Sequence, residues 1–157
     1  MSEPLVGRPQ MPGYGVPDAL EGALPWDWAL ERLKGCRNYF VASSRPDGRP
    51  HVMPVWGAWV PGMFVFSTAI TSVKSKNLLA NPNCVVTIDD GHESVIVEGI
   101  AKIVDADEIP EFFGEYKRKY DYNIPDDKKW AVVPTRAFGF VEDDTFATSA
   151  TKWRWEP

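Results

Sequence analysis

Short strand-like runs separated by turn signals make up most of the chain from residue 38 to its end. This strand–turn pattern is the sequence feature that most constrains the fold. Runs of strand character cover residues 38–43, 49–60, 63–68, 83–89, 93–104, 130–141 and 146–155. Arg45-Pro46-Asp47-Gly48 is a typical turn, because proline presets φ and glycine accepts a positive φ. The pattern predicts a mostly β or α+β domain, a small antiparallel barrel of six to seven strands with short packing helices. A Rossmann sheet is excluded because alternating βαβ units and a GxGxxG turn are absent.

Three segments have helical character, at residues 24–35, 72–80 and 107–120. The third is the clearest, because Phe112, Tyr116 and Tyr120 fall on one stripe and its basic residues suit the helix C-terminus. Residues 1–23 carry four prolines and four glycines without periodicity, and we expect an extended N-terminal arm there. A length of 157 residues fits one domain, placed at residues 24–157.

Composition narrows the class of function. A formal net charge of −5 argues against nucleic-acid binding, which would need a basic stripe. Cys36 and Cys84 lie in apolar contexts and are expected to be buried core thiols, and two distant histidines make a metal site a poor expectation. No run approaches the roughly 18–20 apolar residues of a membrane span, and a secretory signal is missing. We therefore expect a cytoplasmic protein.

The segment FSTAITSVKSKNL, residues 66–78, carries the strongest chemical signal. A strand ends in Ser67 and Thr68, and Ser72 is placed to cap the next helix. The first turn of that helix offers free N–H groups to an anion. Lys74 and Lys76 oppose the helix dipole there, which is explained if they face a phosphate. A solvated basic turn on a surface helix explains the same spacing equally well.

Two further segments complete the candidate site. Pro50 and Pro54 interrupt the run at residues 49–60, so it must be an edge strand, be bulged, or present its backbone to a ligand. His51 alone is more typical of a structural hydrogen bond. At the C-terminus, alternation sends Trp153 and Trp155 to one face and Lys152 and Arg154 to the other. Such an aromatic chain end is expected to be docked.

Together these segments resemble the pyridoxamine 5′-phosphate oxidase-like family, the flavin- and deazaflavin-binding split barrels. The resemblance is carried by RPDGRPHVMPVW (45–56), FSTAITSVKSKNLLANP (66–82), VIVEGIAKIV (95–104) and TKWRW (151–155). It implies a split β-barrel and a homodimer with cofactor sites at the subunit interface. Val73 departs from the pattern, since many relatives carry a second phosphate-binding Arg there. The longer C-terminal motif with which true pyridoxamine phosphate oxidases hold substrate is also missing, so vitamin B6 oxidation is not predicted.

The resemblance also assigns cofactor-binding residues. The strand residues His51, Val52, Met53, Pro54, Val55 and Trp56 would line the ring system, largely through backbone groups. Ser67, Thr68, Ser72 and Lys74 would hold the ribityl chain and phosphate, with Lys76 and Asn77 close by, and Trp153 and Arg154 would complete the site from either subunit. No side chain is identified as a catalytic acid or base.

The resulting expectation is an FMN-dependent oxidoreductase that transfers hydride to or from a small planar substrate. A reductase dependent on the deazaflavin coenzyme F420 is an alternative, because relatives use either cofactor. A non-catalytic flavin or haem carrier is another, because the barrel can hold a cofactor without turnover. A nucleic-acid-binding barrel with exposed aromatic platforms is disfavoured by the acidic charge.

Overall fold

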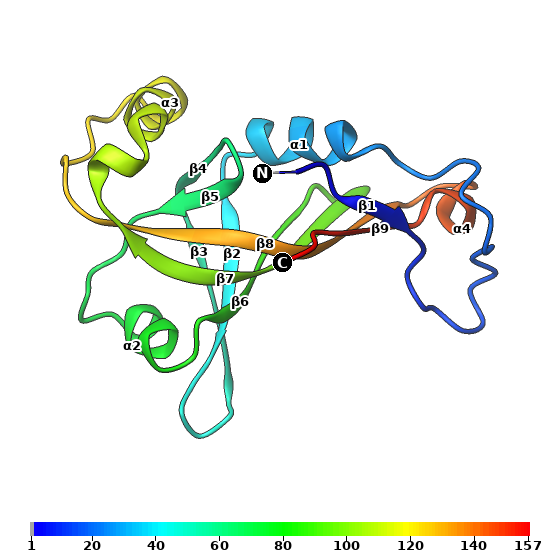
Figure 1. Cartoon of the computed structure of the whole chain (residues 1–157), viewed down its shortest axis with the longest axis horizontal. Coiled ribbons are helices and arrows are strands. Elements are labelled where there is room, and N and C mark those ends of the chain that lie inside the picture. The colour runs from blue at the N-terminus through cyan, green and yellow to red at the C-terminus, as the bar shows by residue number, and fades with distance from the viewer. Residues whose placement is uncertain (1) are drawn as a thin grey trace.

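The computed structural model describes residues 2–157 and contains one nine-stranded, mostly antiparallel sheet (Figure 1). Its main path runs β1-β9-β8-β7-β6-β2-β3, while β5 pairs with β4 and with β8. The strands are β1 (Leu5–Gly7), β2 (Tyr39–Ser44), β3 (Pro50–Val55), β4 (Gly57–Val60), β5 (Met63–Phe66), β6 (Asn83–Asp89), β7 (Glu93–Val104), β8 (Lys129–Val141) and β9 (Thr151–Arg154). The helices are α1 (Trp26–Gly35), α2 (Val73–Ala80), the 3-10 turn η1 (Ala106–Glu108), α3 (Pro110–Tyr120) and α4 (Phe146–Ser149). The sheet does not close, so the predicted split barrel is confirmed.

The run at residues 49–60 forms two strands, which corrects the expectation of one. β3 pairs with β2, and after Trp56 the chain leaves that partner to form the β4–β5 hairpin. Gly57 permits this change, because a Cβ there would lie 2.6 Å from the carbonyl oxygen of Val65. The proline-bearing half is an edge strand, which is one of the three arrangements that its two missing N–H donors allowed.

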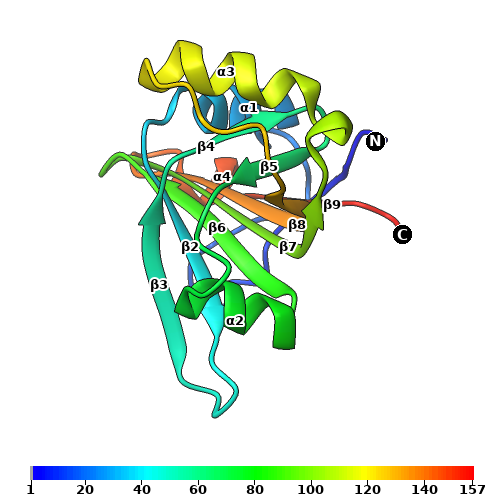
Figure 2. The ribbon, with the colours of Figure 1, turned by 90° about the vertical axis from the view of Figure 1, so that its left-hand side faces the viewer.

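Two apolar clusters hold the layers together. The larger one lies between α1 and the concave face of the sheet and includes Trp26, Leu33, Tyr39, Phe64 and Trp153. The smaller one packs α3 on the β4–β5 hairpin through Phe112, Tyr116 and Tyr120, the stripe predicted from the sequence. α1 and α3 thus lie on one side of the sheet and α2 on the other (Figures 1 and 2). The helix α3 begins later than expected, at Pro110, because Asp105 caps the separate turn η1 before it.

Both chain ends contain structure that the sequence pattern did not indicate. Residues 5–7 of the N-terminal arm form β1 on the edge of β9, with Val6 opposite Trp153. The Arg8 guanidinium donates to the carbonyl oxygens of Ala19 and Glu21 and of Thr148 and Ala150, tying the arm to the C-terminal segment. Residues 146–149 are the helix α4, not the start of a strand. The C-terminus is docked, as expected.

No helix among residues 2–157 has the length and hydropathy needed to cross a membrane. Within the same residues, no three His, Cys, Asp or Glu side chains are grouped as metal ligands would be.

Candidate cofactor site

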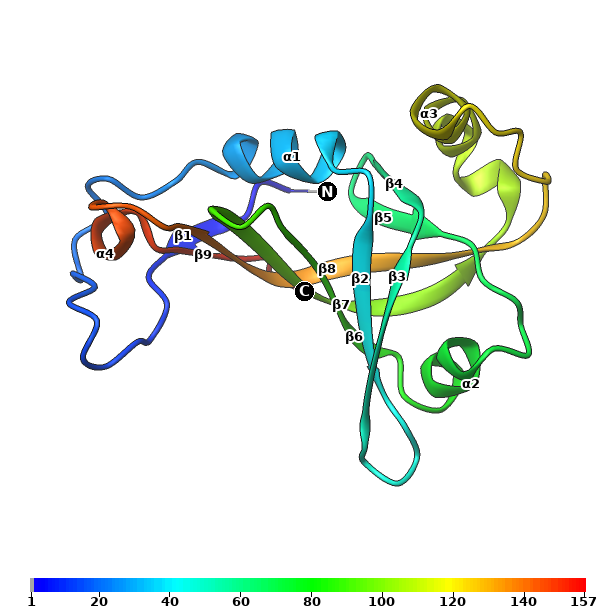
Figure 3. The same cartoon turned by 180° about the vertical axis from the view of Figure 1, so that it is seen from behind.

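The candidate site lies where the β2–β3 hairpin extends beside α2 (Figure 3). β3 contacts only β2, so one edge of its backbone is free of sheet pairing. Val52 and Met53 are 53% and 48% exposed, and Pro54 and Trp56 are exposed too. Val55 is the exception, because its side chain is buried in the main core. A ligand lying on this strand would therefore meet apolar side chains and backbone groups, not the side chain of Val55.

Hydroxyl groups brace the loop between β5 and α2. Ser72 caps α2, since its Oγ accepts from the backbone N–H of Ser75 at 3.0 Å, and Thr68 Oγ1 lies 3.2 Å from the same oxygen. Ser75 Oγ donates to the carbonyl oxygen of Ala69 at 2.8 Å and accepts from Trp130 Nε1 at 3.0 Å. Ser67 is exposed at the start of the loop. A hollow of about 540 Å³ opens beside residues 67–70 and 127–130.

Lys74 is the most unusual group in this region. Only 7% of the residue is exposed, and burial lowers the pKa of its ammonium. No carboxylate of residues 2–157 lies within ion-pair distance of it. A partly desolvated cation without an acidic partner is stabilised when an anion arrives. Lys76, by contrast, is exposed to solvent.

Arg45 adds a second cation near Lys74, and His51 lies close to both. Burial and the nearby charges of Arg45 and Lys74 lower the pKa of His51, which favours a neutral imidazole. Its Nδ1 is buried and has no hydrogen-bond partner among the described residues, so the expected structural hydrogen bond from this atom is absent. Arg45 was missed by the sequence reasoning, which treated RPDG only as a turn. Its signal was a guanidinium in the hairpin loop that leads into the proline-bearing strand.

Asn77 acts within the protein. It is buried, and its Nδ2 donates to Ser43 Oγ at 3.1 Å, which fixes α2 to β2. It therefore supports the loop that carries Ser72 and Lys74.

The structure places the two predicted C-terminal site residues, Trp153 and Arg154, in different environments. Trp153 is 0% exposed and packs its ring 5.3 Å from that of Trp26, so within one chain its side chain belongs to the core, and its contact with a cofactor stays a prediction. The reason is the alternation of β9, which sends its large apolar side chains into the core. Arg154 is exposed, but β9 is separated from β3 by β8, β7, β6 and β2 in the sheet order.

The family model for pyridoxamine 5′-phosphate oxidase matches residues 27–146, which is most of the chain and includes the elements from α1 to β8. This chain belongs to the pyridoxamine 5′-phosphate oxidase-like family. No curated protein matches the sequence significantly.

Solved structures of other proteins share the fold of this chain. A conserved hypothetical protein, Rv2991, from Mycobacterium tuberculosis has a TM-score of 0.67 at 20% identity, covering 76% of this chain and 86% of that one. A protein described as an F420 reductase has a TM-score of 0.56 at 25% identity, over 68% of this chain and 93% of that one. A haem-binding protein from Mycobacterium smegmatis has a TM-score of 0.58 at 15% identity, over 79% of this chain and 55% of that one.

The residues of this family member fit a phosphate-bearing ring cofactor. Lys74 supplies an unpaired ammonium, His51 an orphaned buried nitrogen, and the loop at residues 67–72 supplies hydroxyls. These groups suit an anion, while the exposed apolar side chains of β3 suit a planar ring.

Proposed function

We propose that this protein binds FMN and acts as an oxidoreductase on a small planar substrate. The observation that carries the proposal is Lys74, a desolvated ammonium with no acidic partner among residues 2–157, beside Arg45 and His51. The start of α2 at Ser72 adds backbone N–H groups that have no partner within the helix, as at any helix N-terminus. Together they form a site for one phosphate at the end of an exposed strand.

In this proposal the loop residues bind the phosphate end of the cofactor and β3 binds its ring. Lys74, Ser67, Thr68 and Ser72 hold the phosphate and the ribityl chain, with Arg45 as an added cation and Lys76 at the solvent side. The backbone from His51 to Trp56 and the side chain of Met53 hold the ring. When bound, FMN supplies the hydride-transfer chemistry. The protein orients the ring, offers hydrogen bonds to its polar edge and shields one face from water.

The proposed assembly is a homodimer with the cofactor between subunits. Phe40 and Val52 face outward from β2 and β3, 46% and 53% exposed, and Ile100 is exposed on β7. Exposed apolar side chains on adjoining strands are typical of a protein interface. Arg154 would then act from the partner subunit, since its own chain keeps it away from β3 in the sheet order.

The first experiment is to purify the protein from a host that makes both FMN and coenzyme F420, record its visible absorption, and identify any released chromophore by mass. A flavin spectrum with the mass of FMN supports the proposal. A polyglutamylated deazaflavin would support an F420 reductase, for which the 25% identity to a protein of that description is the favouring observation. A protein that binds neither cofactor contradicts the proposal.

Lys74→Ala tests the phosphate site directly. We expect FMN affinity to fall by about 1–3 kcal/mol, since a charge-assisted contact is lost. Lys117→Ala is the matched control, because it removes the same charge from α3, on the other side of the sheet (Figure 1). Equal affinity of the wild type and the Lys74 variant in a fluorescence titration would remove Lys74 from the site.

A carrier without turnover is the second candidate, and a haem-binding protein of the same fold motivates it. Flavin or haem that binds stoichiometrically, with no steady-state reductase activity towards NAD(P)H or reduced deazaflavin, would favour that candidate.

A further inference from the structure

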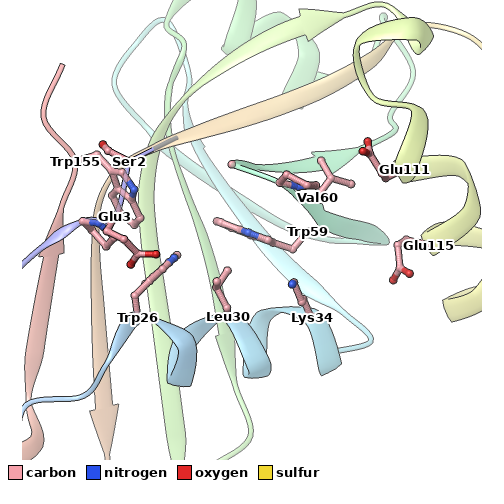
Figure 4. Close-up of a pocket in the computed structure, with 13 residues that line it drawn as sticks. Ser2, Glu3, Trp26, Leu30, Lys34, Trp59, Val60, Glu111, Glu115 and Trp155 are labelled. Atoms are coloured by element: carbon pink, nitrogen blue, oxygen red, sulfur yellow. The ribbon is translucent and has the colours of Figure 1, made fainter.

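A cavity of about 580 Å³ lies between α1, α3, the β4–β5 turn and the two chain termini (Figure 4). None of its lining residues belongs to α2, β3 or the loop at residues 67–72, which form the candidate cofactor site. α2 also lies on the other side of the sheet from α1 and α3 (Figure 1). The cavity volume falls within the range of about 300–1,000 Å³ that is usual for small-molecule sites.

Three tryptophans form the buried part of this cavity. Trp26 contacts Trp59 with ring centroids 6.0 Å apart and Trp155 with centroids 4.8 Å apart. The planes are tilted by 64° and 83°, so the rings meet edge to face and do not stack. All three belong to the main core, which makes the arrangement rigid before any ligand arrives. Tilted indole rings of this kind attract ammonium groups through their electron-rich faces.

The charged side chains around the cavity are mainly acidic. Glu3 lies at one end, Glu111 and Glu115 lie at the other with Trp59 between, and Lys34 extends from α1 (Figure 4). Glu115 is already paired with Arg118 at 2.8 Å. Among residues 2–157, no cation lies within ion-pair distance of Glu3 or Glu111. Two carboxylates therefore remain free to attract a cation.

The carboxylates favour a cationic ligand, whereas Trp155 favours a ligand that carries a hydrogen-bond acceptor. It is buried, and its indole N–H has no acceptor among the described residues. A buried donor without a partner is costly, and a ligand oxygen would relieve that cost. The ligand that meets all these groups has a cationic nitrogen, an apolar body and a hydrogen-bond acceptor.

We propose that this cavity binds a small organic ammonium compound that carries a hydroxyl or carbonyl oxygen. The tryptophan faces and the free carboxylates receive the ammonium group, and the indole N–H of Trp155 donates to the oxygen. The site is independent of the proposed flavin site and shares no residue with it.

Choline is a suitable probe, because it combines a quaternary ammonium group with a hydroxyl. Its neutral isostere, 3,3-dimethyl-1-butanol, has the same shape without the charge. In isothermal titration of the full chain we expect saturable choline binding and at least about tenfold weaker binding of the isostere, because only the cation interacts with the rings and carboxylates. Equal affinity for the two compounds, or no saturable choline binding, would overturn the proposal.

Variants locate the binding. The double variant Glu3→Gln/Glu111→Gln removes both free carboxylates and is expected to lower choline affinity about tenfold. Lys34→Gln removes the opposing cation and is expected to raise it. The matched control, Glu142→Gln/Asp144→Asn, makes the same change of net charge at exposed residues after β8, outside the cavity lining. Unchanged affinity in the cavity double variant, an equal loss in the control, or weaker binding by Lys34→Gln would each contradict the assignment.

Discussion

At Lys119 the protein places an ammonium group against two tyrosine rings. Its Nζ lies 4.4 Å from the ring centroid of Tyr39 and 5.6 Å from that of Tyr120, and it donates to the Tyr39 hydroxyl. Burial lowers the pKa of Lys119 from 10.5 to about 8, despite the weaker opposing effect of the Cys36 thiolate. Burial raises the free energy of the charged ammonium form of Lys119 and not that of the neutral amine.

This makes the contribution of Lys119 to stability depend on pH. Between pH 8 and 10.5 the unfolded chain keeps a proton on Lys119 that the folded chain has released, so stability rises with pH. Other groups titrate in the same range, and comparison with Lys119→Met cancels them. We expect the wild type to gain stability relative to Lys119→Met across this window in urea unfolding. A difference that is constant from pH 7 to pH 10.5 would contradict the lowered pKa.

The two cysteines differ in accessibility, which corrects the expectation that both are core thiols. Cys84 is buried and its pKa is raised by burial to about 12, while Cys36 is only half-buried and donates to the carbonyl oxygen of Asn38 at 2.8 Å. Burial raises the pKa of Cys36 as well. We expect a disulfide reagent at pH 8 to modify Cys36 slowly and Cys84 only on unfolding. A folded Cys36→Ala variant that still reacts would disprove this order.

At the scale of elements, β8 and β9 show how a single glycine sets the spacing between strands. A Cβ at Gly139 would lie 2.6 Å from the ring of Trp153 and 3.0 Å from that of Trp28. Trp153 is fully buried and cannot yield without disturbing the core. Gly139→Ala is therefore expected to destabilise the fold by about 1–3 kcal/mol.

Gly114→Ala is the matched control for that prediction. Gly114 lies inside α3, where a Cβ would meet no neighbouring atom within 4 Å, so alanine should stabilise the helix by about 0.5–1 kcal/mol. Thermal unfolding of the two variants should therefore show opposite shifts of Tm. Two shifts of the same sign would show that steric contact with Trp153 does not decide the effect.

The elements also show which parts of the fold the sequence could predict. Periodicity identified α1, β6 and β7 because each has an apolar stripe or alternation, while α2 was identified by its cap at Ser72 and its end at Asn81-Pro82. β1 escaped prediction because its pairing with β9 joins residues far apart in sequence. The helical turn α4 escaped because four residues are too few to show a period.

The same distinction applies to the candidate site. Ser72 and Lys74 could be proposed for the site from the sequence, because the capping residue and the cations that oppose the helix dipole are neighbours along the chain. Arg45 was missed because its closeness to Lys74 depends on how the β2–β3 hairpin extends beside α2. The core position of Trp153 was not predicted, because alternation separates the two faces of a strand without saying which of them is inside.

At the scale of the whole molecule, the exposed face of the β2–β3 hairpin would link the proposed assembly to the proposed cofactor binding. Val52 opposes Ala42 in the register, and Pro54 opposes Phe40, so apolar side chains adjoin one another across the two strands. The strand that would hold the ring therefore belongs to the proposed subunit interface. Loss of the dimer should weaken cofactor binding, because each proposed site would lose the contribution of Arg154 from the partner subunit.

Val52→Glu tests this link, because the side chain is 53% exposed and its replacement leaves the core of the subunit intact. In sedimentation equilibrium we expect the wild type at twice the 17.6 kDa chain mass and the variant near the single-chain mass. A buried glutamate without a partner at the interface is what separates the subunits. Leu20→Glu places the same charge on an exposed residue of the N-terminal arm and is expected to remain dimeric. FMN titration of both variants then completes the test. A monomeric Val52→Glu variant that binds FMN as tightly as the wild type would show that one chain forms the site alone. Arg154 of the partner subunit would then have no part in the site.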